Sequence, residues 1–298
     1  MMVINSVNYL SNMVSEKSKY HSQGGAVYVQ NVTNILSYIS SFQGNKGSLG
    51  AGLFAINCKN LRNKKLFFQK NNAFVSGGSL FSFNSQNVEF VSCQFLANSG
   101  VRGGALNIIQ CFVINFLNST FSKNSAYGKL EKGKLSKMQG GAVHVKVSKR
   151  LNSLFCKFVL NKVTAIYAEE VTEDEIYSDR DGEGGALYLE NVTEIVHKQC
   201  IFFRNGAISS QDFGITAGGA VFIKHADHIH QYFILFVENV ASTAGGLFVH
   251  NGYNITNRNI RFLHNEAVSA AGCILEKVHF AYNIQCLFQV NHAVKGHG

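Results

Sequence analysis

The stretch GGALNIIQCFVINFLNSTFSKN, residues 103–124, contains both halves of a unit that recurs along the chain. It opens with Gly-Gly-Ala followed by Leu106, and it closes with Phe-x-x-Asn at Phe121 and Asn124. The closing half recurs at Tyr9/Asn12, Phe42/Asn45, Phe68/Asn71, Phe95/Asn98, Phe158/Asn161, Phe202/Asn205, Phe236/Asn239, Phe262/Asn265 and Phe288/Asn291. The opening half recurs from Gly24, Gly140, Gly184 and Gly218, with degenerate copies from Ala51, Gly77, Gly245 and Ala271.

The spacing of the two halves indicates a solenoid. The Gly pair and the next Phe are always 17 or 18 residues apart, and the basic unit is 26 or 27 residues long. Every lengthened copy is lengthened between the Phe motif and the next Gly pair, in the insertions at 125–139, 162–183 and 206–217. Insertions that map to one edge are typical of stacked repeats. We therefore interpret residues 1–298 as one repeat domain.

The residues after each Gly pair alternate with a period of two, which indicates strands rather than helices. Apolar positions such as Leu106 and Ile108 are predicted to face the core, and Asn107 between them to face outward. The fold class predicted from this pattern is all-β, a single-stranded parallel β-helix of about ten rungs. Residues at equal offsets should then be neighbours in adjacent rungs.

Each motif residue has an expected role in this fold. The Gly pair is suited to a turn with positive φ. The motif Phe should point inward and stack on its copies. The motif Asn should lie at a turn, with its amide forming a hydrogen-bonded ladder between rungs.

Composition narrows the class of protein. Hydrophobic residues make up 46% of the chain, charged residues 15%, and Pro is absent. This composition favours a packed core in which nearly all backbone N–H groups join a ladder.

The net charge of +9 is spread along the chain without a compact basic run, so we expect no nucleic-acid partner. No apolar run is long enough for a membrane span. Residues 1–20 lack the order of a signal peptide, which leaves a cytosolic protein or an internal piece of a longer secreted or anchored chain.

The paired Gly-Gly-Ala-Val/Leu and Phe-x-x-Asn repeats resemble those of the chlamydial polymorphic membrane proteins, which also occur in surface proteins of some protists. That family is similar to the pectin-lyase-like right-handed β-helix class and is associated with adhesion. The resemblance covers almost the whole chain and implies a right-handed coil, a cell-surface or extracellular location and a contact role. The sequence departs from that family in that it predicts no signal sequence, membrane barrel or anchor within these residues.

Cysteines and acids offer two candidate sites. Cys156 and Cys200 occupy the same small slot on successive rungs, where they are either free, buried thiols or a disulfide pair. Asp179, Asp181 and Glu183 lie in an acidic loop that partly matches a calcium-binding pattern. The simpler alternative is a solvated acidic loop. Its acids and the lysines of the preceding insertion either pair with each other or form a charged partner site. No bound cofactor is expected.

Catalytic carboxylates are not predicted to stack. In the row two places after the outward aromatic, Glu190 has Lys146 and Lys224 as its neighbours and is expected to be charge-paired. A row of outward-facing aromatic residues is a stronger candidate for a binding site than these carboxylates. Its members either stack on one another to stiffen the sheet or form a contact platform for a sugar chain or a protein. They are Tyr28, Phe54, Phe81, Tyr188, Phe222 and Phe248.

Three functional hypotheses follow. The first is a non-catalytic surface or adhesion module that presents loops from one edge for protein or glycan contact. The second is a pectin-lyase-like carbohydrate-active enzyme, either a polysaccharide lyase or a hydrolase. The third is a fragment of a longer chain without an independent role.

Overall fold

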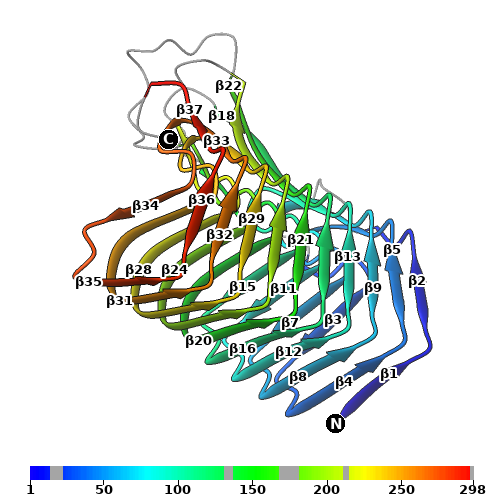
Figure 1. Cartoon of the computed structure of the whole chain (residues 1–298). Coiled ribbons are helices and arrows are strands. Elements are labelled where there is room, and N and C mark those ends of the chain that lie inside the picture. The colour runs from blue at the N-terminus through cyan, green and yellow to red at the C-terminus, as the bar shows by residue number, and fades with distance from the viewer. Residues whose placement is uncertain (14–22, 131–136, 168–180, 211–214, 296–298) are drawn as a thin grey trace.

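The computed structural model describes residues 1–13, 23–130, 137–167, 181–210 and 215–295, and these residues form parallel strands without a helix. The chain passes once per repeat through three sheets, which we call A, B and C (Figure 1). Each strand pairs in parallel with its equivalent in the next repeat, for example β13 with β17. The architecture is therefore an all-β parallel solenoid. This confirms the predicted all-β class and the parallel stacking of the repeats.

The strands of each sheet follow one another at the repeat interval. Sheet A has 15 strands: β1 (Met2–Asn5), β3 (Val27–Gln30), β4 (Asn34–Tyr38), β7 (Leu53–Ile56), β8 (Asn60–Lys64), β11 (Leu80–Phe83), β12 (Asn87–Val91), β15 (Leu106–Ile109), β16 (Val113–Leu117), β20 (Val143–Leu154), β24 (Leu187–Lys198), β28 (Val221–Tyr232), β31 (Leu247–Arg258), β34 (Cys273–Glu276) and β35 (Phe280–Ile284). Sheet B has 10 strands: β2 (Asn8–Leu10), β5 (Ser41–Gln43), β9 (Phe67–Gln69), β13 (Gln94–Leu96), β17 (Thr120–Ser122), β21 (Lys157–Val159), β25 (Ile201–Phe203), β29 (Leu235–Val237), β32 (Arg261–Leu263) and β36 (Leu287–Gln289). Sheet C has 12 strands: β6 (Lys46–Leu49), β10 (Asn72–Ser76), β14 (Ser99–Gly100), β18 (Ser125–Leu130), β19 (Met138–Gln139), β22 (Lys162–Tyr167), β23 (Gly182–Glu183), β26 (Gly206–Ser209), β27 (Thr216–Ala217), β30 (Val240–Thr243), β33 (Glu266–Ser269) and β37 (His292–Ala293).

Residues at equal offsets in the repeat are paired across the sheets, as the sequence predicts. Leu80 pairs with Leu106, and Phe95 pairs with Phe121. The register is kept across the longest insertion, where Phe158 pairs with Phe202. Insertions therefore leave the stacking of the rungs unchanged.

The motif phenylalanines form a continuous stack inside the solenoid. The rings of Phe95 and Phe121 are 4.6 Å apart between centroids and differ by 3° in plane, and both are buried. The stack continues from Phe121 to Phe158 at 4.8 Å. Stacked aromatic pairs contribute beyond the area they bury. Sheet B thus contributes one aromatic residue per rung to the stack, and these rings are buried from Phe42 to Phe262.

The motif asparagines form the predicted ladder with every amide group engaged. Asn71 Nδ2 donates to Asn98 Oδ1 at 3.0 Å and to Phe42 O at 2.8 Å. Asn71 Oδ1 accepts the Nδ2 of Asn45 at 2.8 Å and its backbone N–H at 3.1 Å. The same pattern repeats along the buried column. Each Asn therefore satisfies side-chain and backbone groups that its rung could not satisfy alone.

Positive φ angles occur in the turns at other positions besides the glycines of the Gly motif. Gly184 has φ of 70°, as expected. A Cβ on the following Gly185 would lie 1.9 Å from Gly219 O, so this position tolerates only Gly. Non-glycine residues such as Ala97, which precedes a ladder Asn, also have positive φ, here 53°. The neighbouring ladder bonds hold these turns in a conformation that most side chains disfavour.

The cysteine slot is buried and its thiols are free. Cys156 and Cys200 are free, and Cys200 Sγ contacts Ser153 O at 3.2 Å. Burial raises the pKa of Cys93 in the same slot to about 12. The Cys93 thiol therefore packs as a small apolar group, whereas a hydrogen bond with Cys200 lowers the pKa of Cys156.

Replacement of a ladder residue should destabilise the protein strongly. In Asn98→Ala, the buried amide groups of Asn71 and the carbonyl of Phe68 lose their partner. Unsatisfied buried polar groups cost about 1–3 kcal/mol each, so we expect a loss of at least about 2 kcal/mol in the free energy of unfolding by urea titration. Asn87→Ala is the matched control, because Asn87 also bonds to an asparagine (Asn60) but is exposed. A loss in Asn98→Ala no greater than in the control would contradict the ladder's structural role.

The pH dependence of stability should contain a component from His197. This ring is fully buried, has no hydrogen-bond partner among the described residues, and burial lowers its pKa to about 4. The unfolded state takes up a proton below about pH 6.5, whereas the folded state does so only near pH 4, so stability is lost as the pH falls between these values. The loss is about 2 kcal/mol between pH 7 and pH 5.

His197→Phe tests this component, because Phe116 occupies the same inward column two rungs earlier. We expect the variant to lose less stability than the wild type between pH 7 and pH 5 in urea titrations. Identical pH profiles for the two proteins would rule the component out.

Candidate functional site

The predicted aromatic row lies on the outer surface of sheet A, in the half that follows each Gly pair. The rings stack face to face across neighbouring strands. Tyr28 and Phe54 are 5.3 Å apart between centroids, and Phe222 and Phe248 are 5.1 Å apart. The six residues come from two runs of successive repeats, β3, β7 and β11 and then β24, β28 and β31: Tyr28, Phe54, Phe81, Tyr188, Phe222 and Phe248.

Burial favours the first of the two alternatives for this row, stacking within the sheet, over an open contact platform. Tyr28 is 46% exposed, but the other five rings are 8% exposed or less. Ala217 and Ala244, which lie before the Gly turns, pack in one apolar cluster with Tyr188, Phe222 and Phe248. The row is thus a second, covered aromatic stack, and five of its six members cannot offer a ring face to a ligand.

A groove opens where the aromatic row is interrupted. Asn107 and His144 occupy two successive positions of the row, and His144 Nδ1 lies 2.9 Å from Asn107 Oδ1. The groove above them has a volume of about 510 Å³ and extends from Phe81 to Tyr188. Smaller, polar side chains in place of aromatic rings therefore coincide with the depression.

Charged side chains from two sheets form the walls of this groove. Arg102 and Lys137 come from the sheet C side, and Lys146, Glu190 and Lys224 come from sheet A. Lys146 Nζ is 3.2 Å from Glu190 Oε2, which confirms the predicted pairing of Glu190 with this lysine. The partly exposed pair contributes little to stability but fixes the position of both groups.

The two carboxylates of the groove have protein partners. Tyr188 donates its hydroxyl to Glu190 Oε2 at 3.2 Å. Gln139 Nε2 donates to Glu183 Oε2 at 2.9 Å, and both residues are buried. Glu183 and Glu190 are therefore each held by a hydrogen bond to a neighbouring side chain of the groove.

Burial and charge keep two ring groups of the groove neutral at ordinary pH. Burial, together with the positive charges of Arg102 and Lys146, lowers the pKa of His144 to about 3. Burial raises the pKa of the Tyr188 hydroxyl, and the negative charges of Glu183 and Glu190 add to this shift. His144 and Tyr188 are consequently suited to hydrogen bonding rather than to proton transfer near neutral pH.

The predicted calcium loop is only partly described. Asp179 lies outside the described residues. Asp181 is buried, and its Oδ2 accepts the backbone N–H of Ile215 at 3.0 Å. Among the residues that the structure describes, no group of three His, Cys, Asp or Glu side chains could hold a metal ion.

The groove was not predicted from the sequence. Glu183 and Glu190 stand in different rows of the same rung, so equal offsets along one row do not bring them together. The useful signal is the residue before each Gly pair, because Arg102, Gln139 and Glu183 succeed one another there. These three residues form a row of their own, and this row is the second wall of the groove.

Comparison with known proteins gives no family for this chain. No protein-family model matches it, and no solved structure matches it. The described residues also contain no helix long and apolar enough to cross a membrane.

The structural role of the aromatic row can be tested by truncation. Phe222→Ala should lower the free energy of unfolding by about 3 kcal/mol or more, because a fully buried ring is replaced by a cavity. Tyr28→Ala, at the exposed end of the same row, should cost less than about 1 kcal/mol. Equal losses in urea titrations of the two variants would contradict this interpretation.

Proposed function

We propose that this chain is a non-catalytic repeat scaffold, a surface or adhesion module that contacts a protein or a glycan along one edge. The proposal rests mainly on where the three insertions leave the solenoid. The insertions begin with β18, β22 and β26, which pair side by side, and they end with β19, β23 and β27, which also pair side by side. The insertions thus start and end on neighbouring strands of sheet C.

The groove adjoins this edge. Lys137 and Gln139 lie at the end of the first insertion, Glu183 ends the second, and all three line the groove. Arg102, Lys137, Lys146 and Lys224 outnumber the two carboxylates, and neither Arg102 nor Lys137 has an ion-pair partner among the described residues. This excess of positive charge favours a ligand that carries acidic groups.

The finer architecture belongs to the same proposal. The ten strands of sheet B support a solenoid of ten rungs. The resemblance of the repeats to the chlamydial polymorphic membrane proteins supports a right-handed, pectin-lyase-like coil and a cell-surface or extracellular location.

One observation favours the alternative of a carbohydrate-active enzyme. Glu183 and Glu190 share one groove, and glycoside hydrolases use a pair of carboxylates. Their bonds to Gln139, Lys146 and Tyr188 favour a structural network instead. We therefore rank the non-catalytic role first.

A polysaccharide that carries carboxylates separates the two functions. With polygalacturonate as the probe and neutral dextran as the control, we expect affinity electrophoresis to show retardation by polygalacturonate alone. The Arg102→Glu/Lys224→Glu variant should bind at least about ten-fold more weakly, because two favourable charges become unfavourable. Size-exclusion chromatography should show polygalacturonate of unchanged length.

Two results would count against the proposal. Shortening of the polysaccharide that is lost in Glu190→Gln would establish the enzyme instead. Equal retardation by dextran and polygalacturonate, or by the wild type and the charge variant, would remove the groove from the contact surface.

A further inference from the structure

The outer surface of sheet B has a charge distribution unlike the rest of the molecule. We define the sheet B face as the ten strands of sheet B with the turn residues that border them. Its residues are 5–11, 38–44, 64–70, 91–97, 117–123, 154–160, 198–204, 232–238, 258–264 and 284–290. The strands of this face lie side by side along the front of the solenoid in Figure 1.

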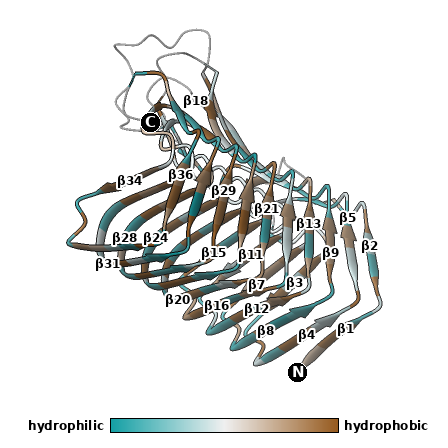
Figure 2. Ribbon diagram, in the orientation of Figure 1, coloured by the Kyte–Doolittle hydropathy of each residue, from teal (hydrophilic) through white to brown (hydrophobic). Residues whose placement is uncertain are grey.

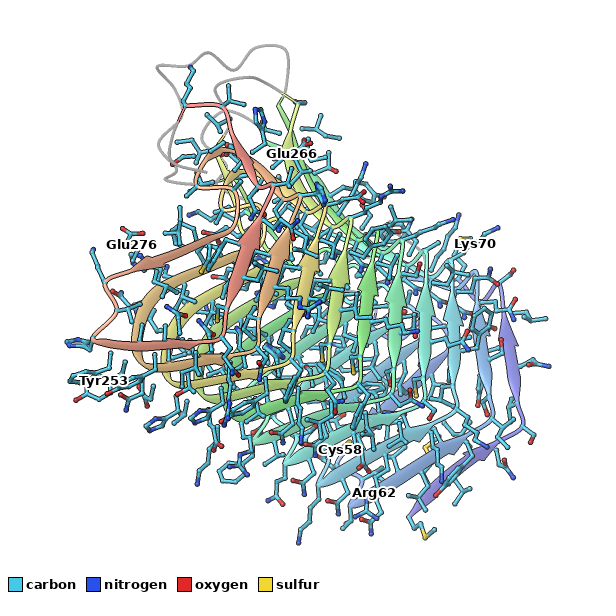
Figure 3. All side chains as sticks on the ribbon, in the orientation of Figure 1. Cys58, Arg62, Lys70, Tyr253, Glu266 and Glu276 are labelled. Atoms are coloured by element: carbon cyan, nitrogen blue, oxygen red, sulfur yellow. The ribbon has the colours of Figure 1, made fainter. Side chains whose placement is uncertain are left out.

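This face carries many cationic side chains and almost no carboxylates. Glu238 is its one carboxylate. The cations are all exposed: Lys64, Lys65, Lys70, Lys123, Lys157, Lys198, Arg204, Arg258 and Arg261. Lys70 lies at the outer edge of the face, beside the end of β9 (Figure 3). Although these residues are scattered in the sequence, the repeat places them on one side.

Most of these cations are not neutralised by the protein. Arg204 pairs with Glu238. None of the other cations of the face forms an ion pair with a described residue. On sheet A, by contrast, Lys146 and Arg150 have Glu190 and Glu194 as partners. The sheet B face therefore attracts anions.

The middle of the face is apolar rather than polar. Ile201 and Phe203 on β25, and Leu235 and Val237 on β29, point outward and are half-buried. β29 is coloured as hydrophobic in Figure 2. A flat strip of this kind, bordered by charge, is typical of a contact surface.

Two exposed phenylalanines at the border give an independent indication. Phe155 and Phe233 are 48% and 55% exposed, with φ of 57° and 56°. A bulky side chain is disfavoured in this left-handed conformation, and an exposed ring gains little from the core. Asn118 and Asn259 stand at the same turn in other rungs, and Asn adopts this conformation readily. Aromatic residues at these two turns therefore serve something other than the stability of the fold.

We propose that the sheet B face docks on the surface of an anionic lipid bilayer. The bordering lysines and arginines pair with anionic headgroups, while the apolar strip and the two phenylalanines enter the boundary between headgroups and acyl chains. A second copy of the chain is disfavoured, because like charges would face each other. A soluble polyanion would pair the cations but leave the apolar strip in water. The proposal is independent of the groove.

Vesicle co-sedimentation of the full chain tests this docking. We expect binding to vesicles of phosphatidylcholine mixed with phosphatidylserine, little binding to phosphatidylcholine alone, and weaker binding as salt is added. Lys157→Glu/Arg261→Glu should weaken binding at least about ten-fold. Lys59→Glu/Lys149→Glu is the matched control, since both lysines are exposed outside this face and the change in net charge is the same.

A second variant separates docking from folding. Phe155→Asn/Phe233→Asn should reduce vesicle binding several-fold without lowering the thermal unfolding temperature, because Asn suits both turns. Equal loss of binding in the two charge variants would show an effect of net charge alone and overturn the proposal. The proposal would also be overturned if the protein did not bind the mixed vesicles. The same holds if it bound heparin or an acidic peptide but not the vesicles.

Discussion

The vertical register between repeats is the constraint on which the rest of the structure depends. It is maintained by two buried columns, the stacked motif phenylalanines and the asparagine ladder. Asn98 shows how the columns act together, because its amide bonds to the next asparagine and to the carbonyl of Phe68. A slip by one residue would bury the wrong side chains and break these bonds at once. The register in turn decides which charges become neighbours on each outer face.

Much of the fold could be predicted from the sequence, because the repeat itself encodes the register. The spacing of Gly103 and Phe121 identified the parallel strands, and the ladder of Asn98 followed from equal offsets. The use of positive φ at non-glycine turns, such as Ala97, could not be predicted, since no residue type marks it. The surrounding ladder imposes that conformation, and this tertiary effect leaves no local signal.

The surfaces were harder to predict than the core. The sequence placed Phe222 on the outside of sheet A correctly, but it gave no sign that residues before the Gly turns cover it. The groove between Phe81 and Tyr188 is lined by residues from both the strands and the turns of the same rungs. Residues at one offset of the repeat therefore do not reveal it. The charge of each face also cannot be predicted from the order of residues along the chain, because Lys157 and Arg261 become part of one face only when the repeats are stacked.

The asparagine column also has a direction. In each pair, such as Asn71 and Asn98, the amide nitrogen of the earlier residue donates to the oxygen of the later one. All carboxamide dipoles consequently point the same way, and they add up as peptide dipoles do in an α-helix. The solenoid is thus electrically polar along its axis, and a further rung can join the column only if its chain runs in the same sense.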